Sequence, residues 1–436
     1  MNSPFPHWRF TRAGLLLLLV LCIIQVASGN DSWDESRRNG TIAREQGRYP
    51  EAKRFLEAAV ARLSDPKDPR RADLDDELAS VYELLGEWGA AEHAYRDALT
   101  IIENDRDNQL GIRTAIGGDF GAFLATQGRF KEAGELLEAA LATSRKAFGE
   151  SDIGTATLKS SLGRLYFLEG KLTDAEPLLH QAVEVHREAL PPSHLDRIMS
   201  ESVLGYLYLL EGRFEKAEPI LRQVSDAARQ LGDSHPTLAF TLTNLADLYR
   251  AEGKSARSEP LFRNALAIYA ASLGPESLKV AETLLDMSID TIASGKFAVA
   301  ERDLSKGLDI LRKINGPEDT TVALGEYWLA RAYTGEGRYA EAEVLLRHAL
   351  PIEERRWPEG SVTVGDCLYA TAEAERLQRH YANAELLYQR TIALYEKCDS
   401  SGTPKLTVAL RQYAKLLKTG RTDEAKALEK RAQSLR

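Results

Sequence analysis

The chain has 436 residues, of which 44% are hydrophobic and 28% are charged, and its formal net charge is −9. This balance is typical of a folded chain and excludes an intrinsically disordered one, which has too few apolar residues to form a core. The acidic charge argues against a general nucleic-acid-binding protein, because such proteins need a basic surface.

Residues 1–29 have the pattern of a secretory signal peptide. Arg9 and Arg12 form a basic start, the uninterrupted apolar run 15–24 follows, and small residues then precede Asn30. We therefore expect cleavage near Asn30 and export of the protein to the periplasm or the extracellular space.

The mature part of the chain is then 30–436, and no membrane insertion is expected once the signal is cleaved. The alternative is that residues 13–29 remain as a membrane anchor, although about 17 residues are at the short limit for a span.

From residue 30 onward, one pattern recurs. The clearest copy is 326–350, in which two runs with helical periodicity flank the turn Gly335-Glu336-Gly337. Large apolar residues would fill the gap between two antiparallel helices, and small ones such as Ala330 and Ala342 would let the backbones approach. The turn position recurs at intervals of 39–42 residues, at Gly47, Gly86, Gly128, Gly170, Gly212, Gly253, Gly295, Gly337, Arg379 and Gly420.

A fixed period of this length predicts an array of identical helical units. We expect an all-α protein in which 30–436 forms one solenoid of about ten antiparallel helical hairpins, without a second domain. The aligned positions resemble the tetratricopeptide repeat, in the 42-residue form of kinesin light chains. The connector Leu231–Ala239 is similar to the Leu-Gly-x-x-His-Pro-x-x-Ala connector of that subclass. The resemblance implies a right-handed superhelix whose concave face is lined by the first helix of each hairpin.

Two repeats depart from this pattern in ways that predict local changes. In repeat six, Ser255 and Ser258 replace the usual aromatic residue and alanine, so we expect looser packing at its turn. In repeat nine, Arg379 occupies the turn position that is glycine elsewhere.

The concave groove is the predicted functional surface. Positions ten, nine, six and three residues before each turn would face it, and several are arginine or aromatic residues, which suit the recognition of a peptide. The alternative for each arginine is an ion pair with a carboxylate of the neighbouring helix. The resemblance also implies that Asn244 could bond a ligand's main chain. The candidate residues are Arg164, Phe167, Tyr206, Asn244, Asp247, Arg250, Tyr327, Trp328, Arg331, Tyr369 and Arg376.

We expect a non-enzymatic scaffold that binds a protein or an extended peptide. The alternatives are a self-assembling platform, which would make the protein a homo-oligomer, and a non-catalytic subunit of an enzyme complex. We expect no cofactor and no metal, because the eight histidines are scattered over different repeats and no Cys-x-x-Cys or His-Glu-x-x-His motif occurs.

Cys367 and Cys398 raise a separate question. They lie at opposite ends of the predicted hairpin of repeat nine, and antiparallel packing would bring those ends together. One interpretation is a disulfide bond, which an exported protein can retain. The other is two separate thiols, and the geometry of the pair decides between them.

Overall fold

The computed structural model describes residues 32–63, 65–103, 110–357, 360–398, 403–418 and 420–435. The signal peptide or anchor predicted for residues 1–29 lies outside these ranges. In the described part of the chain, regular structure consists of twenty α-helices and one short 3-10 helix, without strands. The predicted all-α class is confirmed. No described helix combines the length and the apolar character that a bilayer span requires.

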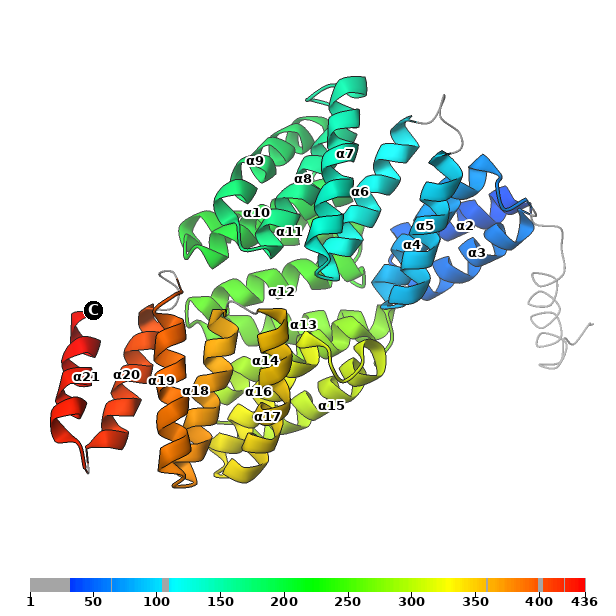
Figure 1. Ribbon diagram of the computed structural model, residues 1–436. Coiled ribbons are helices and arrows are strands. Elements are labelled where there is room, and N and C mark those ends of the chain that lie inside the picture. Colours follow the sequence, from blue (N-terminus) through cyan, green and yellow to red (C-terminus); the bar gives the residue numbers. More distant parts are fainter. Residues whose placement is uncertain are drawn as a thin grey trace, which may run out of the picture.

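The helices form ten antiparallel hairpins that follow one another along a solenoid (Figure 1). The first helices are α2 (Trp33–Glu45), α4 (Pro69–Leu85), α6 (Leu110–Thr126), α8 (Ile153–Leu168), α10 (Leu195–Leu210), α12 (Pro236–Ala251), α14 (Leu278–Ala293), α16 (Thr320–Gly335), α18 (Val362–Leu377) and α20 (Thr403–Leu417). The second helices are α3 (Tyr49–Arg62), α5 (Trp88–Glu103), α7 (Phe130–Phe148), α9 (Leu172–Ala189), α11 (Phe214–Ala228, extended by the 3-10 helix Arg229–Leu231), α13 (Ser255–Ser272), α15 (Phe297–Asn315), α17 (Tyr339–Arg356), α19 (Tyr381–Tyr395) and α21 (Thr422–Ser434).

The predicted turn glycines end the first helices in a left-handed conformation. Eight of them have φ between 70° and 80°. The amide after the turn then donates to a carbonyl five residues back, as Arg129 N does to Leu124 O at 2.9 Å. This hydrogen bond satisfies a carbonyl that the helix end would leave without a donor. Glycine recurs here because it adopts this backbone conformation without a Cβ clash.

Repeat nine makes the same turn with a side chain present, since Arg379 has φ of 68°. A left-handed residue other than glycine costs about 1–2 kcal/mol. We therefore expect Arg379→Gly to raise the free energy of unfolding by about 1 kcal/mol, measured by urea denaturation. The reciprocal change Gly337→Arg, at the equivalent position of repeat eight, should lower it by a similar amount. A destabilised Arg379→Gly variant would contradict the strain at this turn.

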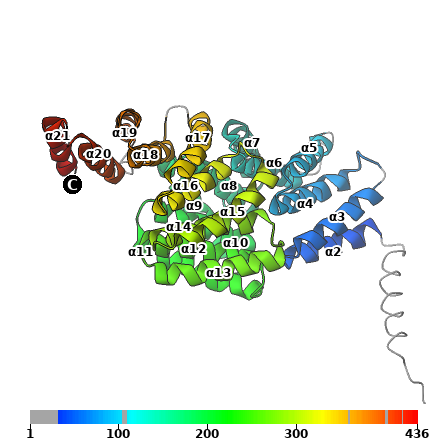
Figure 2. The same cartoon turned by 90° about the horizontal axis from the view of Figure 1, so that it is seen from below.

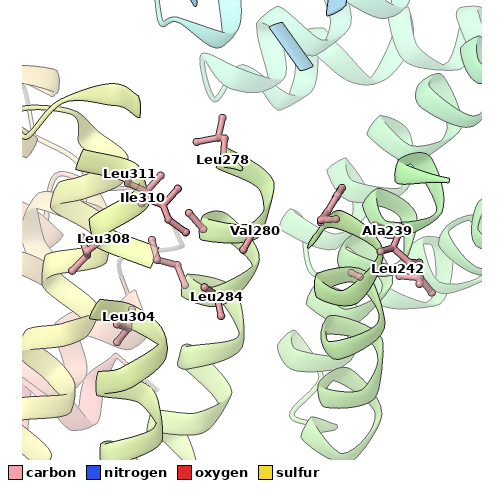
Figure 3. Close-up of a cluster of buried hydrophobic side chains, with 14 of the residues drawn as sticks. Ala239, Leu242, Leu278, Val280, Leu284, Leu304, Leu308, Ile310 and Leu311 are labelled. Atoms are coloured by element: carbon pink, nitrogen blue, oxygen red, sulfur yellow. The ribbon is translucent and has the colours of Figure 1, made fainter. Parts of the chain in front are cut away.

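Close helix packing explains the small residues seven positions before each turn. Ala246 and Ala330 are fully buried. A Cβ placed on Gly205 would lie 2.8 Å from Cδ2 of Leu221, on the opposite helix of the hairpin. The core continues from one hairpin to the next: Figure 3 shows Leu242 on α12, Leu284 on α14 and Leu308 on α15 in one cluster. Each repeat thus completes the core of its neighbour.

The expectation of looser packing in repeat six is wrong. Its helices α12 and α13 stay in close contact, and Ser258 is fully buried. Ser258 Oγ donates a 2.5 Å hydrogen bond to Oδ2 of Asp290 on α14, and Ser255 Oγ lies 3.5 Å from Oδ1 of the same carboxylate. The serines replace apolar contacts with hydrogen bonds to the next repeat.

Ion pairs between neighbouring repeats recur at fixed positions. The residue six positions after one turn pairs with the residue directly after the next turn. In four cases a glutamate pairs with an arginine, and between repeats one and two the charges are reversed, which shows that the pairing matters more than the sign. The pairs are Glu92–Arg129, Glu176–Arg213, Glu301–Arg338, Glu385–Arg421 and the reversed Lys53–Glu87.

The solenoid coils far enough for distant repeats to touch. Trp88, at the start of α5, donates from Nε1 to Oδ1 of Asn315 at the end of α15, at 3.0 Å. The indole packs against two apolar clusters, one in repeats two to four and one in repeats five to eight. Figure 1 and Figure 2 both show the N-terminal helices beside the middle of the chain.

Two further contacts close the coil on either side of Trp88. His235 Nε2 donates to the backbone carbonyl of Glu45 at 3.0 Å. The guanidinium of Arg356 lies 3.4 Å from the carbonyl of Gly128 and 4.9 Å from the ring centroid of Phe130. Repeats one to three therefore contact repeats six to eight, and the side of the coil between them is enclosed.

Candidate functional site

The first helices form the inner side of the coil. Besides their hairpin partners, they contact the first helices of adjacent repeats: α4 contacts α6, α6 contacts α8, α8 contacts α10, α10 contacts α12, and α14 contacts α16. We call the side that they present to the coil axis the inner surface. All eleven predicted groove residues lie on first helices: Arg164 and Phe167 on α8, Tyr206 on α10, Asn244, Asp247 and Arg250 on α12, Tyr327, Trp328 and Arg331 on α16, and Tyr369 and Arg376 on α18.

The structure brings four of these residues into a central cluster on α8, α10 and α12. The rings of Phe167 and Tyr206 meet edge to face, with centroids 6.0 Å apart. Tyr206 donates its hydroxyl to Asp247 Oδ2 at 3.2 Å, and Arg250 donates to Oδ1 of the same carboxylate at 2.5 Å. Arg250 also donates to the backbone carbonyl of Asp286 at 2.9 Å. Most polar atoms of this cluster bond one another, so it is a rigid platform.

Asn244 lies in the same helix, but its side chain is buried. It offers little surface to a ligand. The implied role in bonding a ligand's main chain therefore rests on the resemblance, and the geometry gives it no further support.

A second cluster lies on α16. The rings of Tyr327 and Trp328 are 5.0 Å apart, and the guanidinium of Arg331 lies 5.3 Å from the Trp328 centroid. Tyr327 is buried, whereas Arg331 is exposed. In the described ranges, Arg331 has no carboxylate within ion-pairing distance, and its guanidinium donates to the Tyr327 hydroxyl at 3.3 Å. An exposed guanidinium above an indole is suited to gripping a carboxylate or a planar group.

The arginines thus divide into two kinds. Arg164 and Arg331 have no ion-pair partner among the residues that the structure describes, so they remain available to a ligand. Arg250 and Arg376 pair with carboxylates three residues earlier on their own helices, Asp247 and Glu373. An ion pair with the neighbouring helix was the alternative considered for each arginine. It holds in part for Arg250, whose guanidinium also lies 4.0 Å from Oδ1 of Asp286 on α14, whereas Glu373 lies on the same helix as Arg376.

The inner surface also carries acidic residues outside the predicted set. They are Asp76 and Glu83 on α4, Asp119 on α6 and Asp286 on α14. All four occupy the positions ten, nine or three before a turn, so applying the same rule to repeats two, three and seven would have found them. The prediction favoured arginine and aromatic residues and included Asp247 as its one carboxylate.

These carboxyl groups hold protons more tightly than usual. The surrounding helices exclude water from much of the region around Asp119 and so raise its pKa to about 7, although its side chain is exposed on one side, and the neighbouring charges of Glu83 and Asp196 add to the effect. Burial and the charge of Asp247 raise the pKa of Asp286 to about 8. Because these helices enclose the inner surface, like charges on it lie close together and oppose ionisation.

These raised pKa values predict a pH dependence of stability. Between about pH 4 and pH 8 the unfolded chain loses protons that folded Asp119 and Asp286 retain, so stability falls as pH rises through this window. We expect the melting temperature of the wild type to drop more between pH 5 and pH 8 than that of the Asp119→Asn/Asp286→Asn variant. Circular dichroism at both pH values measures this. Parallel changes in the two proteins would contradict it.

Cys367 and Cys398 are not joined by a disulfide bond in the structure. Cys367 is 1% exposed, and burial raises the pKa of its thiol. Such a thiol reacts slowly, because the thiolate is the reactive form. A disulfide between the two residues stays a prediction, which the intact mass before and after reduction and alkylation tests.

Glu343, Glu375 and His380 offer one group of atoms that could hold a metal ion, all within 4.8 Å of one another. The group occupies the position of the inter-repeat pairs described above, with His380 where most other repeats have arginine or lysine. Glu343 already accepts from Gln378 at 2.8 Å, and His380 Nδ1 lies 2.9 Å from Glu375 Oε2. Protein partners thus already engage these ligand atoms, and the group is explained as a repeat contact.

Comparisons with known proteins identify the repeats along most of the coil. A family model described as tetratricopeptide repeat matches residues 35–104, 113–188, 154–230, 194–269 and 237–313, and a second one matches 329–355. Together they cover more than half of the chain. No curated protein sequence matches the chain significantly.

Solved structures share the architecture. A Rap protein complexed with competence and sporulation factor has a TM-score of 0.60 at 16% identity, over 84% of this chain and 98% of that one. The apo form of RapI has a TM-score of 0.54 at 11% identity, over 83% and 97%. BtubC (BKLC) from P. vanneervenii has a TM-score of 0.39 at 24% identity, over 53% and 92%. The first two likenesses support the solenoid fold.

Proposed function

The chain belongs to the tetratricopeptide repeat family, and from this premise we propose that it is a non-enzymatic scaffold that binds an extended segment of a protein partner on its inner surface. Proteins of this family generally mediate protein–protein interactions and are generally not catalysts. The single observation that carries the proposal is the exposed Arg331 above Trp328, on the same inner surface as the rigid platform of Phe167 and Tyr206. Aromatic and arginine side chains in such settings dominate protein-binding energies.

The binding mode follows from the shape of the coil. An extended segment can run along the first helices of several repeats and use one position on each, as repeat arrays do with their concave surfaces. The Rap protein of the same fold was solved in complex with a factor, which is consistent with a coil that holds a partner. The enclosed side of the coil favours a segment of chain over a folded domain.

Site-specific crosslinking tests this proposal. A photoreactive benzoylphenylalanine at Phe167, on the inner surface, should crosslink a partner in the producing cells. The same group at Leu386, which is 62% exposed on α19, is the matched outer control. Crosslinked partner at the inner position, lost again with Trp328→Ala/Arg331→Ala, supports the scaffold. Partner crosslinked at the outer position alone would remove the inner surface from consideration.

A second candidate is self-association through the outer helices. Val344 on α17 and Leu386 on α19 are 67% and 62% exposed and occupy the same position in adjacent repeats, seven after the turn. Exposed apolar residues in such an arrangement suit a protein contact. Light scattering coupled to size exclusion tests it: mass should rise with concentration in the wild type and not in Val344→Ser/Leu386→Ser. A monomer at all concentrations would exclude this assembly.

We also propose that the protein is exported and that its connectors place it in the kinesin-light-chain-like subclass. Support for the subclass comes from His235, whose Nδ1 accepts from the amide of Thr237 at 3.1 Å and so caps α12. Support for export is the pattern of residues 1–29 alone. N-terminal sequencing of the purified protein should begin at or near Asn30. An intact N-terminus in the membrane fraction would favour the anchor instead.

A further inference from the structure

Asp76 on α4 and Asp119 on α6 are two acidic residues of the inner surface that have no ion-pair partner among the described residues. In the described part of the chain no lysine, arginine or histidine lies within ion-pairing distance of either carboxyl group. By contrast, Glu92 and Glu301, which join neighbouring repeats, each pair with an arginine. The nearest basic influence on both is Arg44, which acts through space, while Glu83 and Asp196 add further negative charge around Asp119.

The environment of Asp76 makes this lack of partners costly. The residue is 9% exposed, and its Oδ1 atom is buried without a hydrogen-bond partner among the described residues. A buried carboxyl oxygen with no donor loses its hydrogen bonds to water without replacing them, which costs free energy. Burial and the adjacent Asp119 raise the pKa of Asp76 well above its ordinary value. Asp119 itself is exposed and lies within hydrogen-bonding reach of Asp76, so a ligand that contacts Asp119 from the coil axis also meets the side chain of Asp76.

We propose that Asp76 and Asp119 form a docking position for an arginine or lysine side chain of the extended segment bound on the inner surface. The inference rests on the proposed function and specifies the chemistry of the partner. A guanidinium presents several N–H donors in one plane and can serve both carboxylates at once. Its charge would offset their mutual repulsion, and one N–H would supply the missing donor to Asp76.

Glu83 is a poorer candidate for this role. It accepts a 3.4 Å hydrogen bond from Tyr95, and Arg164 and Lys279 both lower its pKa against the effect of burial. Opposite charges of the protein therefore already balance it. Among the described residues of the neighbouring helices α4 and α6, Asp76 and Asp119 are the carboxyl groups that no opposite charge balances closely.

Fluorescence anisotropy with defined peptides tests the docking position on the full chain. The probe is a short labelled peptide of alternating arginine and serine, and its counterpart carries citrulline, which has nearly the same shape but no charge. We expect the arginine peptide to bind at least about tenfold more tightly than the citrulline peptide. The Asp76→Asn/Asp119→Asn variant should lose about tenfold in affinity for the arginine peptide.

The matched control is Asp226→Asn/Asp423→Asn, which removes the same charge at positions that are 71% and fully exposed. It should change the affinity by less than about twofold. An equal loss in both variants, no discrimination against citrulline, or no binding of the arginine peptide would each overturn the docking position. So would a rise in melting temperature with calcium chloride alone that the Asp76→Asn/Asp119→Asn variant abolishes, since that result assigns the pair to a metal ion.

A folding defect and a failure of the proposed function can both be distinguished from a failure of the docking position. Aspartate and asparagine have nearly equal size, and removal of the repulsion should leave the melting temperature unchanged or higher. If the Phe167 crosslink persists while the arginine peptide shows no preference, the docking position fails and the scaffold stands. If partner is crosslinked at Leu386 alone, the scaffold itself fails.

Discussion

Phe262→Ala is expected to lower the free energy of unfolding by about 3–5 kcal/mol. Phe262 lies on α13, nine positions after the turn of repeat six, and its side chain is fully buried. Removing the ring leaves a cavity in the core that the close-packed helices cannot fill. It also removes the face on which the guanidinium of Arg250 rests, 5.3 Å from the ring centroid. We therefore expect weakened order in the central cluster of the inner surface as well.

Urea denaturation followed by circular dichroism measures the loss, and hydrogen exchange locates it. Exchange should increase first in repeats five to seven, because each repeat is stabilised mainly by its neighbours. Leu386→Ala is the control, since that side chain is largely exposed and its removal should change stability by less than about 0.5 kcal/mol. Equal effects of the two substitutions would mean that Phe262 does not support the core.

Trp88→Ala is expected to open the coil. The substitution removes the hydrogen bond to Asn315 and the apolar contacts that link the clusters of repeats two to four and five to eight. Because the indole is half-buried, we expect a loss of about 2 kcal/mol, below the range for fully buried aromatic residues. With the link gone, the N-terminal repeats should move away from α14 and α15, and the radius of gyration should increase.

Small-angle X-ray scattering measures the change in shape. Trp88→Phe is the control, because it keeps most of the apolar contact and removes the N–H donor, at a cost of about 1 kcal/mol. It should therefore retain the compact shape. A Trp88→Ala variant with unchanged scattering would show that His235 and Arg356 hold the coil closed without the indole.

The local fold could be predicted from the sequence because its causes lie within one repeat. The turn at Gly128 follows from the need for a positive φ, and the small residue at Gly205 follows from the approach of Leu221. The prediction failed at Ser258, because its hydrogen-bond acceptor, Asp290, lies in the next repeat. The inner-surface arginines and aromatics were placed on the correct helices, since their positions relative to the turns fix which way a helix presents them.

The repeat period by itself determined the helical hairpins, their order and the side of each first helix that faces the coil axis, because these depend on contacts between adjacent segments. The tertiary structure decided which repeats meet across the coil and which charges are left without partners. Trp88 and Asn315 are 227 positions apart, and their contact depends on the sum of small rotations between successive repeats. The sequence of a single repeat does not reveal this accumulated rotation. The surroundings of Asp76 and Asp119 could therefore be seen only in the folded coil.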